Sequence, residues 1–347
     1  MTEEHGKFAG PGVRRVDTRY FLIVLVPIAV FVMEAVISDH LMAEDVQVPT
    51  GILSADNHWL EAAGRYRFLA STWFFAALTV LAVWILVRRL LQPTTRQTRV
   101  VALMTWLVVV ALALSPTIMN AFGDGGSPAY RVLGKTFFEA ALAQGTVPGC
   151  AAPGDHWLLG RCGDMPAISL FERIMDVINL LAGLAVGALI VGMILCLDTR
   201  RCEDAEEEAA LLAENLRLMR QQLYLASLVL TFGMFFVTSW MNWPVPVILD
   251  AQKAAYGSLV LSAALFSGTF FTLLLLSFYL PVAFILSERA RRLSRQVAGR
   301  RADALVVQDW MATHGLKDGL GDYLRAGFAL TAPILSAFAG GVAPFPI

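Results

Sequence analysis

The chain has 347 residues, of which 57% are hydrophobic and only 16% are charged, and its formal net charge is −1. Its mean hydropathy is +0.61. These values exclude an ordinary soluble domain and predict an integral membrane protein.

Six apolar segments are long enough to cross a bilayer, which takes about 20 residues in a helix. Helices are expected because lipid cannot satisfy backbone amides, and because the segments lack the alternation of barrel strands. The predicted spans are residues 20–38, 68–87, 100–119, 174–197, 223–241 and 256–286. The first is too long for a signal-peptide core and has no clear cleavage site, so we expect it to be retained. The expected fold class is all-α, a polytopic bundle of six transmembrane helices.

The positions of the Lys and Arg residues predict the orientation. With residues 1–19 in the cytoplasm, 20 of the 27 fall in cytoplasmic segments and 7 on the far side. We therefore expect a multi-pass protein of a bacterial-type inner membrane with both termini in the cytoplasm. The chain then divides into a tail at residues 1–19, the bundle at residues 20–286 and a C-terminal segment at residues 287–347.

The large external loop, residues 121–173, contains Cys150 and Cys162 in a turn-rich sequence. An oxidising exterior favours a disulfide between them, and two unpaired thiols are the alternative. Cys196 and Cys202 fall at the cytoplasmic end of the fourth span.

A cytoplasmic helix is predicted at residues 198–222, and it continues into the fifth span without an intervening Pro or Gly. Apolar residues recur along it with the a/d spacing of a coiled coil. They are Ala205, Ala209, Leu212, Leu216, Met219 and Leu223. This seam predicts a homo-oligomer or a subunit of a membrane complex. An amphipathic helix that packs on another part of the same chain fits the spacing equally well.

A basic segment follows the sixth span. Its arginines are Arg289, Arg291, Arg292, Arg295, Arg300 and Arg301. Facing the membrane, such a cluster attracts anionic lipid headgroups at about 1 kcal/mol per charge. The simpler alternative is a flank that only fixes the topology. Nucleic acid is not expected as a partner, because no aromatic residues interleave with the arginines.

The uncharged run at residues 326–347 has the length of a seventh span. Pro333, Gly340 and Gly341 are expected to break it, and no charged residue beyond it anchors the far end. We therefore expect a tail that packs on the membrane surface or folds under the bundle.

Few polar residues fall within the spans. Glu34 lies in the first span, and Asp176 and Asn179 lie near the external start of the fourth. An intramembrane ionisable residue is a candidate for a proton or ion pathway. The alternatives are that these side chains reach water, and that Asp176 pairs with Arg173. In the same span Gly183 and Gly187 form a GxxxG pair, which predicts close helix packing.

Enzyme and cofactor motifs are missing from the sequence. It contains no GxSxG, HExxH or Walker motif and no paired cysteines at zinc spacing, so no cofactor is expected. Several external residues could bind a metal by type, namely His40, Glu44, Asp45, Asp56 and His58. Nothing in their spacing fixes a coordination geometry, so no metal site is predicted.

Together these features predict a non-enzymatic, oligomeric membrane protein. It would act as a channel, a pore or a signal-responsive subunit coupled to a cytoplasmic helical module. A secondary transporter is the alternative, although the spans show no repeat symmetry. A membrane-embedded enzyme is the third hypothesis, and it rests on Glu34, Asp176 and the external acidic and histidine residues.

Overall fold

The computed structural model describes residues 13–37, 58–121, 156–157, 160–161, 167–200, 202, 204–298, 304–316 and 319–342. Nearly all of them are helical. The elements in chain order are η1 (Thr18–Val24), α1 (Leu25–Ile37), α2 (His58–Leu91), α3 (Arg96–Ala121), β1 (His156–Trp157), β2 (Gly160–Arg161), α5 (Ala167–Ile194), α6 (Ala205–Asn242), η3 (Val245–Val247), α7 (Asp250–Ala298), α8 (Ala304–Thr313) and α9 (Leu320–Val342). The two short strands pair antiparallel.

Seven of the described helical segments are long and apolar enough to cross a membrane. Six of them correspond to the predicted spans, and the fold class is all-α as predicted. Large apolar side chains cover the outside of the bundle; on α2, for example, Trp73 is 77% exposed and Trp84 is 61% exposed. Such a surface would drive aggregation in water, whereas the hydrocarbon of a bilayer solvates it.

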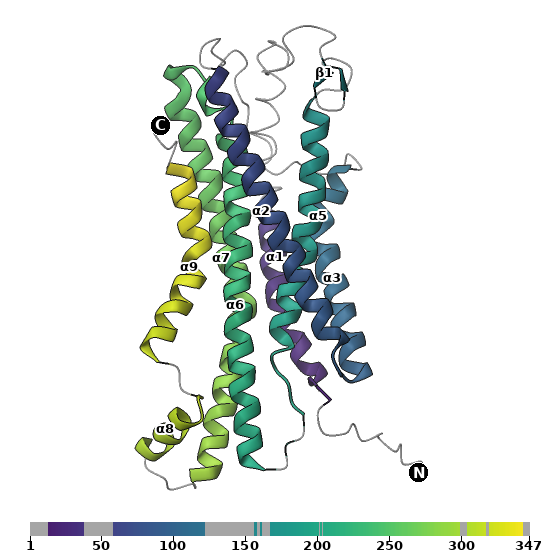
Figure 1. The fold of residues 1–347 in the computed structure, drawn as a ribbon, viewed down its shortest axis with the longest axis vertical. Coiled ribbons are helices and arrows are strands. Elements are labelled where there is room, and N and C mark those ends of the chain that lie inside the picture. Colours follow the sequence, from purple (N-terminus) through teal and green to yellow (C-terminus); the bar gives the residue numbers. More distant parts are fainter. Residues whose placement is uncertain are drawn as a thin grey trace.

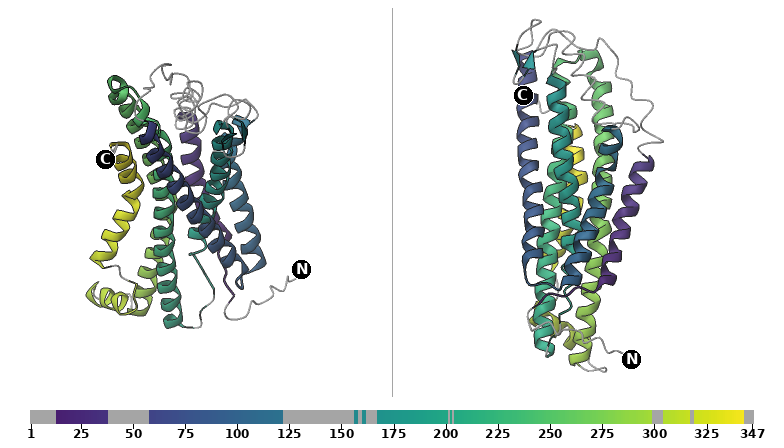
Figure 2. Two further views of the ribbon diagram at one scale, coloured as in Figure 1. Left: turned by 45° about the horizontal axis from the view of Figure 1, so that its top comes forward. Right: turned by 90° about the vertical axis from the view of Figure 1, so that its right-hand side faces the viewer.

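The bundle consists of two groups of helices. α6, α7 and α9 pack along one another, while α2 and α3 both pack on α5. α2 joins the groups because it packs on α6 as well, and Figure 1 shows it crossing the bundle obliquely. At this crossing the buried ring of Phe68 lies 5.0 Å from the ring of Trp240 and 5.4 Å from that of Trp243. α1 lies against α7 and α3, at one side of the bundle in Figure 2.

Glycines allow the close approach of α5 to α3. A Cβ atom on Gly187 would lie 2.8 Å from the Trp106 ring, and one on Gly183 would lie 3.0 Å from Leu114. The Trp106 indole N–H also donates to the carbonyl of Leu184 at 3.0 Å. The predicted GxxxG pair therefore lies in a helix contact that leaves little room for a larger side chain.

α6 and α7 are longer than a bilayer requires. Their 38 and 49 residues correspond to about 57 and about 73 Å, at about 1.5 Å per residue. The extra length lies at one end of the bundle, the lower end in Figure 1. We call the two extensions, residues 205–222 and 287–298, the stalk. α6 begins at Ala205 rather than at residue 198, because the Asp204 side chain caps it by accepting from the N–H of Glu207 at 2.7 Å.

The predicted seam of α6 packs within the single chain. Ala205 is exposed, but five seam residues are at most 5% exposed, namely Ala209, Leu212, Leu216, Met219 and Leu223. α6 packs against α7, on whose extension Ala290 and Leu293 are buried as well. The surface predicted to join copies is thus covered by the chain itself. This burial favours the alternative that the heptad spacing allowed, and the seam carries no inference about an oligomer.

The run after residue 320 forms a helix of membrane length, contrary to the expected surface tail. α9 continues through Pro333 and packs on both α6 and α7. Neighbouring helices can accommodate a proline at membrane depth, where they replace the contacts that it removes. The carbonyl of Gly340 accepts from the Asn242 side chain at the end of α6, at 2.8 Å. The described end of α9 therefore lies at the end of the bundle opposite residue 13, which differs from the prediction that both termini share one side (Figure 1).

Candidate functional site

The predicted intramembrane polar residues each lie near the end of a span. Glu34 is half-buried in the last turn of α1. In α5, Asn179 is half-buried, and Asp176 is 37% exposed and lies 3.9 Å from the Arg173 guanidinium. These positions favour the alternative that the side chains reach water or pair locally.

A more extensive polar arrangement lies at the opposite end of the bundle, where residues 14–16 run between two loops. The N–H of Thr95, after α2, donates to the carbonyl of Arg14 at 3.1 Å. The N–H of Thr199, after α5, donates to the carbonyl of Arg15 at 2.6 Å. Backbone hydrogen bonds therefore tie this N-terminal segment to both the α2–α3 turn and the α5–α6 linker.

Asp198 is the buried centre of this arrangement, with only 4% of the residue exposed. Its Oδ1 atom accepts from the backbone N–H of Arg15 at 3.0 Å and from that of Arg200 at 3.1 Å. Its Oδ2 atom lies 3.6 Å from Nε of Arg200. A carboxylate is stable in a buried site only with such partners, because burial removes its hydration. One side chain thus joins the linker to the N-terminal segment.

Two stalk side chains bind the backbone of the same residue. Asn215 of α6 is 2% exposed, and its Nδ2 atom donates to the Asp198 carbonyl at 3.2 Å. Arg289 of α7 donates to that carbonyl at 3.2 Å and lies 4.9 Å from the centre of the Tyr20 ring, within cation–π range. Arg289 therefore faces inward, which corrects its assignment to the lipid-facing basic cluster.

The other arginines of the predicted cluster differ from Arg289. Arg291, Arg292 and Arg295 are exposed on α7, and Arg292 pairs with Glu288 at 2.9 Å. The remaining two, Arg300 and Arg301, lie outside the described residues.

Exposed ion pairs surround the buried centre. Glu214 of α6 lies 3.5 Å from Arg14 and 3.2 Å from Arg200, and its side chain is 47% exposed. At this exposure each pair contributes about 0–1 kcal/mol, so the pairs orient the segments more than they stabilise them. We call this whole set the junction: residues 14–16, Asp198, Arg200, Glu214, Asn215 and Arg289.

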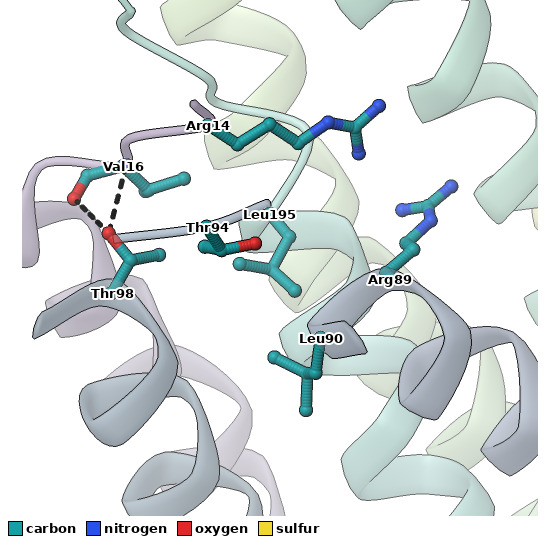
Figure 3. A pocket seen from close by; sticks show the side chains of 7 residues that line it. All are labelled: Arg14, Val16, Arg89, Leu90, Thr94, Thr98 and Leu195. Atoms are coloured by element: carbon teal, nitrogen blue, oxygen red, sulfur yellow. Dashed lines mark hydrogen bonds between the residues drawn. The ribbon is translucent and has the colours of Figure 1, made fainter. Parts of the chain in front are cut away.

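A small pocket adjoins the junction, between the N-terminal segment, the end of α2, the start of α3 and the end of α5; it holds about 270 Å³ of space, open solvent included. Figure 3 shows the side chains of Arg14 and Arg89 extending toward the same side of it. Arg89 donates to the carbonyl of Gly192 at 2.9 Å and lies 3.6 Å from Sγ of Cys196. Among the described residues no carboxylate lines this pocket. The pocket is therefore basic, and its arginine heads are held by neighbouring segments of the chain.

The two described cysteines offer no activated thiol. Burial raises the pKa of the Cys196 thiol, and the Arg89 guanidinium offsets this only in part. Burial, together with Glu207 and Glu208, also raises the pKa of Cys202. A thiol with a raised pKa is a poor nucleophile at neutral pH. Cys150 and Cys162 lie outside the described residues, so their disulfide stays a prediction.

Metal binding finds no support in the described part of the chain. There, no group of three or more His, Cys, Asp or Glu side chains could hold an ion. Of the external candidate residues, His40, Glu44, Asp45 and Asp56 lie outside the described ranges.

The junction brings together hydrogen-bonding and ion-pairing groups, and the role that this geometry suits is mechanical attachment.

The sequence-based predictions did not include the junction, although one residue signalled it. Asn215 lies between Leu212 and Leu216 on the buried side of α6. A buried amide requires hydrogen-bond partners, so a polar residue beside the seam indicates a specific contact. Its partner could not be read from the sequence, because Asp198 belongs to a linker without regular periodicity.

None of the protein families, curated proteins or solved structures compared with this chain matches it. The geometry of the junction therefore carries the functional inference.

Proposed function

We propose that the protein is a non-enzymatic, multi-pass inner-membrane protein that responds to a signal at its stalk and transmits it to the bundle through the junction. One observation carries this proposal. α6 and α7 each run unbroken from the stalk into the bundle, and side chains of both bind the carbonyl of Asp198. The same residue binds the N-terminal segment.

The geometry gives this transmission a physical basis. A displacement of the stalk along either helix changes the distance from Asn215 or Arg289 to Asp198. Because these bonds converge on one residue, the N-terminal segment and the end of α5 must either follow the displacement or lose bonds. An element that can exist with these bonds made or broken can couple distant parts of a membrane protein.

We place the junction in the cytoplasm and α9 across the membrane. A seventh span leaves the cation distribution unchanged, because no Lys or Arg follows Arg325. We therefore expect a cysteine in place of Ile347 to react with an impermeant maleimide in intact cells, and one in place of Gln296 to be protected. The reverse pattern would reject this orientation.

Transmission through the junction is tested by distance measurements at the far end. In protein whose native cysteines are replaced by serine, nitroxide labels are placed at the exposed residues Tyr66 and Leu249. Electron–electron resonance in nanodiscs then compares the labelled parent with Asp198→Ala. The control is Asp204→Ala, which removes the N-terminal cap of α6 but no bond to the N-terminal segment.

We expect Asp198→Ala to shift or broaden the distance distribution and Asp204→Ala to leave it unchanged. Identical distributions for the parent and Asp198→Ala would reject transmission through the junction.

A further inference from the structure

A second hollow lies at the end of the bundle opposite the junction, between α2, α6 and α9. It is a depression that opens to the surroundings, and about 510 Å³ of space lies within it, open solvent included. Arg67 of α2 lines it, at the boundary of the predicted span 68–87, together with Ser239 and Asn242 in the last turns of α6. Its position places it at the interface between hydrocarbon and water.

Glycines hold the walls of this hollow close together at its edges. A Cβ atom on Gly340 of α9 would lie 2.6 Å from the hydroxyl of Thr238. One on Gly64 of α2 would lie 2.8 Å from the carbonyl of Trp243. Both α2 and α9 therefore touch the end of α6 directly. The hollow lies between these close contacts, so it does not result from helix ends that separate from one another.

The polar groups in the hollow are arranged for a partly anionic ligand. Within the described part of the chain, Arg67 and Ser239 form no ion pair or hydrogen bond, and no carboxylate lines the hollow. Asn242 uses its Nδ2 atom to donate to the carbonyls of Thr238 at 2.9 Å and Gly340 at 2.8 Å. Its Oδ1 atom remains as an acceptor. The hollow thus offers a cation, a hydroxyl and an acceptor.

An apolar track leads from the hollow toward the membrane interior. Phe235 lines the hollow, and Leu228 and Tyr224 follow it on the same face of α6 at intervals of seven and four residues. These three side chains are 36%, 43% and 38% exposed. Phe74 of α2 stacks on Phe232 at 4.2 Å between ring centres, and the Phe232 ring lies 5.5 Å from that of Phe235. A ligand with a polar head in the hollow would therefore have its tail along hydrocarbon-facing side chains.

We propose that the hollow binds one glycerophospholipid by its headgroup. The phosphate accepts from Arg67 and Ser239, and an ammonium group on the headgroup donates to Oδ1 of Asn242. The acyl chains follow the track from Phe235 to Tyr224. Hydrogen bonds between a guanidinium and a phosphate are strong because both groups are charged. The apolar track selects a lipid over a free phosphorylated solute. This site is independent of the proposed function of the junction.

Native mass spectrometry of the full chain in mild detergent tests the site. The purified protein is offered phosphatidylethanolamine, phosphatidylglycerol and glycerophosphoethanolamine, which is the headgroup without acyl chains. We expect one retained phosphatidylethanolamine, at least about tenfold weaker retention in Arg67→Gln, and a smaller loss in Ser239→Ala. Arg173→Gln, which removes an exposed arginine at the same end of the bundle, is the matched control and should retain the lipid.

Three outcomes would overturn part or all of the proposal. Equal retention by Arg67→Gln and the parent would reject the headgroup site. Equal binding of glycerophosphoethanolamine would reject a lipid and indicate a soluble ligand. Phosphatidylglycerol retention that equals that of phosphatidylethanolamine and is lost to the same extent in Arg67→Gln would reject the role of Asn242 toward an ammonium group. Ala339→Phe fills the hollow without adding charge, and it should abolish retention if the ligand lies there.

Discussion

Asp198 gives the sharpest test of the junction. Its replacement by Ala removes the acceptor of two backbone N–H groups and one partner of the Arg200 guanidinium. Each hydrogen bond to a charged acceptor contributes about 1.5–3 kcal/mol, which sets an upper bound of about 6 kcal/mol for two. Arg15 is exposed and Arg200 keeps Glu214 at 3.2 Å, so water and this pair recover part of the loss. We expect Asp198→Ala to lower the free energy of unfolding by about 2–4 kcal/mol, and Asp198→Asn by about 1–2 kcal/mol, because an amide keeps one acceptor.

The assay has a global and a local readout. Unfolding in mixed micelles, followed by circular dichroism as sodium dodecyl sulfate is added, reports the free energy. Trypsin cleavage after Arg15 reports release of the N-terminal segment. The control, Asp204→Ala, should cost about 1 kcal/mol through its lost cap without faster cleavage at Arg15. If Asp198→Ala costs no more than this control and leaves cleavage unchanged, the carboxylate does not hold the segment.

Three further predictions concern packing and reactivity. Gly187→Ala should lower the free energy of unfolding by about 1–3 kcal/mol, because the new Cβ meets the α3 surface. Gly257→Ala, where nothing lies within 4 Å, is the control and should be neutral or stabilising in the same dodecyl sulfate titration; equal effects of the two changes would contradict the close contact. The double substitution of Leu212 and Leu216 by Asp should reduce helicity without changing the mass measured by light scattering, since both side chains are buried within one chain. A drop in mass with full helicity would instead support the hypothesis that the seam joins copies of the protein. Cys196 should react with iodoacetamide more slowly than free cysteine at pH 8, because its raised pKa lowers the thiolate fraction and burial restricts access. Peptide mass mapping before and after denaturation measures the extent of alkylation, and rapid labelling of the native protein would refute the prediction.

Much of the helical architecture was predictable because hydropathy depends on composition over about 20 residues. The six expected spans all fall within or close to described helices. α9 was missed because Pro333 and the glycines at 340 and 341 read as helix breakers in isolation. In the bundle those glycines instead allow α9 to touch α6 and α7, where a Cβ would lie 2.6 and 2.7 Å from its neighbours.

The apolar seam of α6 shows the limit of periodicity. The spacing from Ala209 to Leu223 correctly marked a buried face, because side chains three and four residues apart share one side of a helix. The same spacing carries no information on whether the covering surface belongs to a second copy or to α7. Packing within the chain decides that question.

The sequence by itself therefore determined the all-α class, the positions of most of the apolar helices of membrane length and the asymmetry of the charges along the chain. These properties are local, or they are sums over short windows. Only the tertiary structure decided that Asp198 binds the backbone of Arg15, which lies 183 residues earlier, and that Arg289 turns inward to the same site. Such contacts depend on where the helices end and on how they pack, and neither is set by the residues of one segment alone.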